Sequence, residues 1–130
     1  MLFHGDEERN INDLDIWIDN ERENAKACFN ALTSIMSGHL NFQPNDLFKE
    51  GRKIDLKKSH YDVELFTSMD GAKFGESFPR CKTCVQDGES LYFIGVQDLL
   101  CIKRLAYEIC HERRDKEGKD IAFLARILNL

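Results

Sequence analysis

Two aspartates near the start of the chain have a spacing that suits a divalent-metal site. Asp13 and Asp15 lie two positions apart inside the short apolar run Asp13–Ile18. In an extended strand successive side chains point to opposite faces, so both carboxylates would lie on one face, roughly 6–7 Å apart along the chain. Carboxylates at that spacing can share a pair of divalent ions about 3.5–4 Å apart. The alternative interpretation is an edge strand with a solvated polar face.

A second strand-like segment, Tyr61–Phe66, also carries acids opposite an apolar face. Asp62 and Glu64 alternate with apolar residues, so they would share the polar face of that strand. Asp62 is therefore a candidate third carboxylate. Asp55, in the strand-like segment Lys53–Leu56, is its rival for that role.

Composition limits the class of protein. The chain has 130 residues, of which 42% are apolar and 32% charged, which predicts one domain over residues 1–130 with a single core. The net charge of −5 argues weakly against a nucleic-acid coat protein but leaves an RNA substrate open. No apolar stretch approaches the ~20 residues of a membrane span, and the first residues do not resemble a signal peptide. We therefore expect a cytoplasmic protein without a membrane partner.

The chain has five cysteines, and this odd number without an export signal favours reduced thiols. Cys81 and Cys84 have the spacing of a zinc knuckle, and Cys110-His111 could complete such a site. No second C-x-x-C is present, so a zinc-binding adaptor is only a distant alternative. The remaining cysteines are expected to be small buried side chains: Cys28, Cys101 and Cys110.

The periodicity along the chain predicts an α/β (α+β) fold, with a mixed sheet flanked by helices and a C-terminal helical pair. The segments Asp13–Ile18 and Tyr61–Phe66 should be adjacent in this sheet, because their apolar faces match. The first helix should be capped by Asp19 or Asn20, because short polar side chains accept hydrogen bonds from the first turn, and it should stop at Gly38. The other expected elements are strands at Lys53–Leu56 and Tyr61–Phe66, a turn at Lys73–Phe78, a hairpin of Cys81–Val85 and Ser90–Ile94 around Asp87-Gly88, a helix from Val96, a charged loop at Arg113–Gly118 and a last helix reaching Leu128.

Three segments together resemble the minimal nucleotidyltransferases, which are small polymerase-β-like proteins that include the AbiEii-type toxins and related antitoxins. The matches occur in the family's order and cover most of the chain. They are His4-Gly5 followed by Arg9 and Asp13-Leu14-Asp15; Tyr61–Gly71; and Val96–Arg104 followed by Arg114 and Lys119-Asp120.

The resemblance implies transfer of a nucleoside monophosphate from a nucleoside triphosphate to an acceptor. Asp13 and Asp15 would hold Mg²⁺ or Mn²⁺. Asp62 would bind a second ion and help to deprotonate the acceptor. Asp62 is preferred over Asp55 because the segment Thr67–Gly71 that follows it matches the family.

The resemblance also implies nucleotide-binding roles for Gly5, Arg9, Lys103 and Lys119. Lys103 would reach the triphosphate from a helix, or else extend its charged head into solvent. Arg9 would contact phosphate or position the loop before the first strand. Lys119 and Asp120 would form a structural pair that seats the last helix.

One family feature has no counterpart in this sequence: the Gly-Gly or Gly-Ser pair upstream of the His-Gly segment, which cradles the triphosphate. Either Met1 is internal to a longer protein or the chain is a shortened relative, and the chain as given is expected to be weak or inactive. The missing strand would leave a sheet edge open to a homodimer. The expected function is transfer to an RNA end, such as that of tRNA, or to a partner protein. The alternative is a non-catalytic module that binds a cognate toxin or antitoxin.

Overall fold

The computed structural model describes residues 13–36, 40–58, 61–109 and 114–128, with the backbone alone for residues 57, 58, 61 and 114–117. The chain forms two compact units, Met1–Ser68 and Met69–Leu130. Helices and small sheets are both present, so the predicted mixed α and β class is confirmed. Organisation as one nucleotidyltransferase-like domain stays a prediction.

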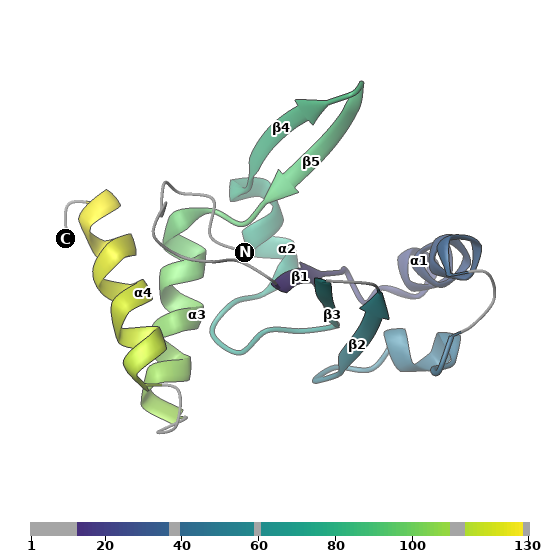
Figure 1. Ribbon diagram of the computed structural model, residues 1–130, viewed down its shortest axis with the longest axis horizontal. Coiled ribbons are helices and arrows are strands. Elements are labelled where there is room, and N and C mark those ends of the chain that lie inside the picture. The colour runs from purple at the N-terminus through teal and green to yellow at the C-terminus, as the bar shows by residue number, and fades with distance from the viewer. Residues whose placement is uncertain (1–12, 37–39, 59–60, 110–113, 129–130) are drawn as a thin grey trace. The chain divides into compact units, whose positions relative to one another are not determined.

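The first unit contains a three-stranded mixed sheet in the order β1-β3-β2. The central strand β3 (Tyr61–Phe66) runs parallel to β1 (Asp13–Trp17) and antiparallel to β2 (Lys53–Lys58). Figure 1 shows the three strands side by side. The predicted adjacency of the two acid-bearing strands is confirmed. Their alternation explains it, because each has one apolar face to bury against the same core.

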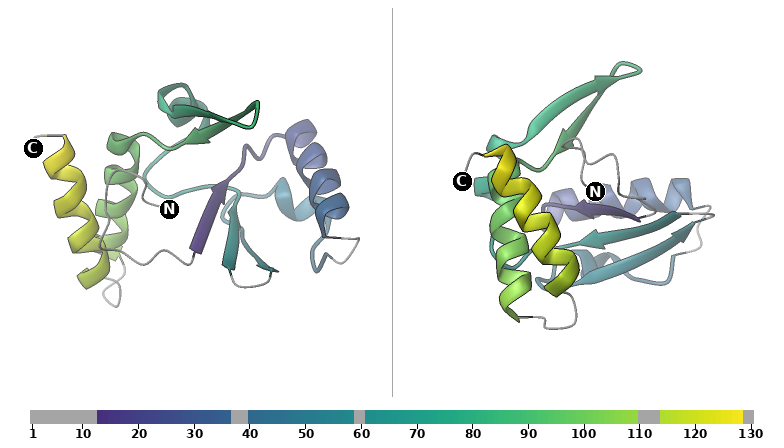
Figure 2. Two further views of the ribbon diagram at one scale, coloured as in Figure 1. Left: turned by 45° about the horizontal axis from the view of Figure 1, so that its top comes forward. Right: turned by 60° about the vertical axis from the view of Figure 1, so that its left-hand side comes forward.

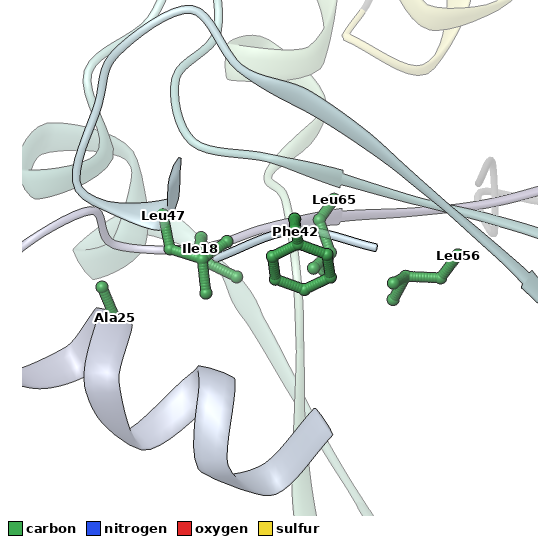
Figure 3. Packing of buried hydrophobic residues seen from close by; sticks show 6 residues of the cluster. All are labelled: Ile18, Ala25, Phe42, Leu47, Leu56 and Leu65. Atoms are coloured by element: carbon green, nitrogen blue, oxygen red, sulfur yellow. The ribbon is translucent and has the colours of Figure 1, made fainter. Parts of the chain in front are cut away.

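Helix α1 (Arg22–Ile35), a 3-10 helix (Pro44–Leu47) and the residues Ile18 and Phe42 outside these elements also contribute to the core of this unit. Apolar side chains of α1 recur at helical spacing and pack against the apolar side of the sheet. Figure 3 shows the buried cluster, to which α1 contributes Ala25. Its six members are Ile18, Ala25, Phe42, Leu47, Leu56 and Leu65. Burial of one face of the sheet leaves the charged residues of β1 and β3 on the other.

The cap of α1 differs from the prediction. Glu21, rather than Asp19 or Asn20, is the N-cap residue, and its carboxylate accepts hydrogen bonds from the backbone N–H groups of Glu23 (3.1 Å) and Asn24 (3.2 Å). Asp19 instead accepts a hydrogen bond from the backbone N–H of Glu21 (3.2 Å) and so fixes the residue that caps. The two N–H groups that donate to Glu21 lower the pKa of its carboxyl group below the ordinary value of 4.5.

We expect this cap to make the stability of the first unit depend on pH. Because the pKa of Glu21 is lowered in the folded state, the ionised carboxylate stabilises the fold above pH 4.5. This stabilisation is lost as the pH falls below 4.5 towards the folded-state pKa. The melting temperature of Glu21→Gln should therefore lie below that of the wild type at neutral pH, and the gap should close in acid. Glu50→Gln, at an exposed position outside any helix, is the control. A gap that does not change with pH would contradict the assignment.

The second unit contains a short helix α2 (Phe74–Ser77), a hairpin and two longer helices. The hairpin pairs β4 (Lys82–Gln86) with β5 (Glu89–Phe93), and the left-handed φ angles of Asp87 (53°) and Gly88 (79°) form its turn. Helices α3 (Val96–Ile109) and α4 (Arg114–Ile127) lie side by side in both views of Figure 2. The predicted helical turn, hairpin and C-terminal helical pair are confirmed.

A charged pair ties the start of α3 to the segment before the hairpin. The guanidinium of Arg80 donates two hydrogen bonds to the buried carboxylate of Asp98, from Nε (3.1 Å) and Nη2 (2.7 Å). The Asp98 carboxylate raises the pKa of Arg80. Gly95 keeps this approach possible, since a Cβ there would lie 2.9 Å from the backbone oxygen of Arg80.

Three smaller predictions fail or cannot be placed. Helix α4 begins at Arg114, so most of the predicted charged loop is helical. Cys101 is exposed and Cys28 is half-buried, whereas both were expected to be buried. The expected stop of α1 at Gly38 lies outside the described residues.

Across the described ranges, no helix combines the length and the apolar character that a membrane span requires.

Candidate functional site

The pairing of β1 with β3 brings the predicted acids together. In this parallel register Asp13 lies opposite Asp62, and Asp15 lies opposite Glu64. Residues directly opposite one another in neighbouring strands share a face, and the strands lie about 4.8 Å apart. Asp13, Asp15 and Asp62 are all exposed, on the face of the sheet that the core leaves open.

Strand β2 extends this charged face. Asp55 lies opposite Glu64, so Asp15, Glu64 and Asp55 form one row across all three strands. Asp62 is adjacent to β1, whereas Asp55 is separated from β1 by β3. The register therefore places Asp62, rather than its rival Asp55, beside the two aspartates of β1.

The side-chain amine of Lys53 offsets part of the negative charge on this face of the sheet. Lys53 Nζ lies 3.4 Å from Glu64 Oε2 and 5.9 Å from the centroid of the Phe66 ring. Neither Lys53 nor Glu64 was assigned to the site from sequence. The alternation of Tyr61–Phe66 already placed Glu64 on the face of Asp62, but the partner of Glu64 depended on the pairing of β2 with β3.

The two predicted lysines lie in the second unit. Lys103 Nζ is 2.9 Å from Asp120 Oδ2, and the two side chains are only 16% and 5% exposed. Lys119 is exposed. Asp120 joins α4 to α3 through this contact with Lys103, which agrees with the structural role predicted for it, whereas the structural role of Lys119 stays a prediction. A role for Lys103 and Lys119 at the carboxylates of the first unit stays a prediction.

The remaining predicted site residues belong to the nucleotide-binding set or to the alternative zinc site. Gly5 and Arg9 lie outside the described residues, as do Cys110 and His111 of the zinc alternative. Cys81 is half-buried directly before β4, and Cys84 is exposed within that strand. The structure therefore adds nothing that favours a zinc site at the C-x-x-C sequence.

The donor chemistry of the carboxylate face fits a hard divalent cation. Carboxylate oxygens are the ligands that Mg²⁺ and Mn²⁺ prefer. Within the described ranges, no three His, Cys, Asp or Glu side chains are arranged as a group that could hold a metal ion. Because Asp13, Asp15 and Asp62 are exposed, rotation about their side-chain bonds can gather them without disturbing the core.

Comparisons with known proteins do not identify a family. The chain matches no protein-family model, and no curated protein and no solved structure matches it.

We expect Mg²⁺ or Mn²⁺ to raise the melting temperature of the protein, because a ligand that binds only the folded state stabilises it by mass action. The double variant Asp13→Asn/Asp15→Asn should lose this gain. Its melting temperature without metal should rise, since two like charges on one face are removed. Thermal melts with and without each metal test both effects. An unchanged metal response in the double variant would remove these aspartates from the site.

Proposed function

We propose that this chain is a nucleotidyltransferase-like protein that uses the exposed carboxylates of β1 and β3. The single observation that carries the proposal is the parallel register of these strands, which puts Asp62 beside Asp13 on the face that also holds Asp15. Two strands far apart in sequence thus contribute acids to one solvent-exposed face, while Leu65 of β3 and Ile18, directly after β1, lie in the core. The resemblance of the sequence to minimal nucleotidyltransferases agrees with this arrangement. The polymerase-β-like fold is part of the same proposal.

Each acid has a role in the proposed reaction. Asp13, Asp15 and Asp62 would hold the divalent cations, which offset negative charge at the reacting phosphate when bound. Asp62 helps to take the proton from the acceptor hydroxyl. The acceptor oxygen then forms a bond to the α-phosphorus as the bond to pyrophosphate breaks. The substrates are a nucleoside triphosphate and an RNA end or a protein hydroxyl.

Incorporation of labelled nucleotide tests this function. The protein is incubated with each of the four α-³²P-labelled nucleoside triphosphates, Mg²⁺ or Mn²⁺, and either bulk tRNA or total cell protein as acceptor. We expect weak incorporation with at least one triphosphate and acceptor, and none from Asp13→Asn/Asp15→Asn. Asp87→Asn is the matched control, because it removes an exposed carboxylate at the hairpin turn, where asparagine tolerates the left-handed φ. No incorporation in any combination, or equal incorporation by the double variant, would contradict the proposal.

A second candidate function is a non-catalytic interaction module, such as one that binds a cognate toxin or antitoxin. The observation that favours it is that the described side chains are not arranged to hold a metal ion. This candidate predicts that the melting temperature responds to a protein partner and not to Mg²⁺ or Mn²⁺. The metal-dependent melts described above therefore separate the two functions.

A further inference from the structure

Strand β1 is an edge strand with hydrogen-bonding groups turned outwards. In the described part of the chain it pairs with β3 alone. The N–H of Ile18, directly after β1, donates to the backbone oxygen of Phe66 (3.0 Å). Backbone groups alternate in direction along a strand, so those of Asp13 and Asp15 point away from β3, towards the outer edge.

The outer edge of β1 lacks three of the features that commonly block strand addition. Edge strands are commonly protected by proline, lysine or a bulge, and β1 (Asp-Leu-Asp-Ile-Trp) has none of them. Leu14 and Ile16 lie on the core side of the sheet, yet each is 37% exposed. On the opposite side, Asp13 and Asp15 present two carboxylates. An added strand would therefore meet an apolar surface on one side and an acidic surface on the other.

We propose that the outer edge of β1 is a docking site for an extended segment of another protein in which Lys or Arg alternates with apolar residues. Its basic side chains would lie across from Asp13 and Asp15, and its apolar side chains would cover Leu14 and Ile16. Main-chain hydrogen bonds would supply affinity, and the alternation would supply specificity. This site goes beyond the proposed nucleotidyl transfer and does not depend on it, but its occupant and a divalent cation would compete for Asp13 and Asp15.

The other side of the same sheet already shows this complementarity. Strand β2 has the sequence Lys-Ile-Asp-Leu-Lys-Lys and pairs with the acidic strand β3. Lys57 lies opposite Asp62 in the register, and the amine of Lys53 contacts Glu64. The apolar residues of β2 lie opposite the apolar residues of β3 on the core side. A basic and apolar strand is thus the partner that an acidic strand of this sheet accepts.

A second copy of this chain is a poorer occupant. Two β1 strands paired antiparallel about Leu14 would set Asp13 of each copy opposite Asp15 of the other. Like charges directly opposite one another are destabilising. The β2 strand of a second copy would meet the same problem in the antiparallel register that sets Lys57 opposite Asp13, because that register also sets Asp55 opposite Asp15. A heterologous partner avoids both repulsions.

Peptide binding tests the chemistry of the occupant. A fluorescein-labelled nine-residue peptide that alternates lysine with isoleucine or valine is titrated with the full chain, and anisotropy is recorded. We expect binding, and at least tenfold weaker binding for two controls. One control replaces each lysine by glutamate, and the other collects the lysines at one end. Equal affinity for either control, or no binding of the alternating peptide, would overturn the proposal.

Two further measurements test addition at the edge itself. Asp15→Pro and Asp15→Asn both remove the carboxylate, but only the proline removes the outward N–H group, so Asp15→Pro should bind the alternating peptide at least tenfold more weakly than Asp15→Asn.

Methylation of alternate backbone nitrogens in the peptide needs no variant protein. Methylating one alternating set should abolish binding and methylating the other should preserve it, because only one edge of the peptide meets β1. Loss with both sets, or with neither, would overturn edge addition.

Discussion

Replacing Asp62 by asparagine should reduce nucleotidyl transfer by roughly 10²–10⁴-fold, the range expected when a general base is lost. Asp62 lies beside β1, directly opposite Asp13, so its carboxylate can act with the acids of that strand. Asp55→Asn should leave most of the activity, because Asp55 lies on the strand farthest from β1. Initial rates of labelled-nucleotide incorporation, measured for both variants at saturating metal, make the comparison.

The two variants form a matched pair. Each converts one exposed aspartate of the same sheet face to its closest uncharged analogue, so a general effect of reduced negative charge would appear in both. Circular dichroism spectra of both variants should match that of the wild type, since neither side chain belongs to the core. A larger loss for Asp55→Asn than for Asp62→Asn would assign the third carboxylate to β2 and contradict the site proposed here.

Replacing Asp120 by asparagine should lower the free energy of unfolding of the second unit by about 3–5 kcal/mol, the cost of breaking a buried ion pair. The pair joins α3 to α4, and the carboxylate of Asp120 is 5% exposed. Urea denaturation followed by circular dichroism at the helical minimum measures the loss. Glu108→Gln, at an exposed position of α3, should change the free energy by less than about 0.5 kcal/mol.

Removal of both charges distinguishes an ion pair from simple packing. Lys103→Met/Asp120→Leu keeps similar side-chain volumes, and its stability should return close to that of the wild type. Single and double variants that are equally destabilised would show that the charges of Lys103 and Asp120 do not interact energetically. That result would contradict the importance assigned to this pair in joining the helices.

Local patterns in the sequence predicted most of the elements correctly. Strands β1 and β3 alternate apolar with acidic residues, and the shared apolar face predicted that they would be neighbours. The pair Asp87-Gly88 marked the hairpin, because these residue types accept the left-handed conformation that its turn requires. The placement of Asp13, Asp15 and Asp62 on one face followed from the same two-residue period.

Interactions between distant residues were harder to predict. The charged residues at the start of α4 resembled a loop, and Gly118 lowers helical propensity. A Cβ at Gly118 would lie 3.5 Å from the ring of Tyr107, which is an ordinary contact distance, so α4 passes close to α3 at this residue. The segment is helical despite its low local propensity. The pairing of Asp120 with Lys103 likewise depended on the contact between these helices, which no local pattern specifies.

The prediction of the residue that caps α1 was wrong for a different reason. Glutamate is uncommon at the N-cap, where shorter polar residues are preferred, so Asp19 and Asn20 were the better candidates from sequence. Glu21 succeeds because both of its carboxylate oxygens accept backbone N–H groups of the first turn. The ion pair of Glu64 with Lys53 could not be predicted from local sequence either, since it joins residues on two different strands.

Paramagnetic broadening by Mn²⁺ tests the central claim, that the carboxylates of β1 and β3 form one divalent-cation site, most directly. The backbone amide signals of isotopically labelled protein are followed as a small fraction of Mn²⁺ is added. We predict that broadening centres on Asp13, Asp15 and Asp62, that excess Mg²⁺ reverses it, and that Asp13→Asn/Asp15→Asn abolishes it. Broadening centred elsewhere, or unchanged in the double variant, would contradict the account.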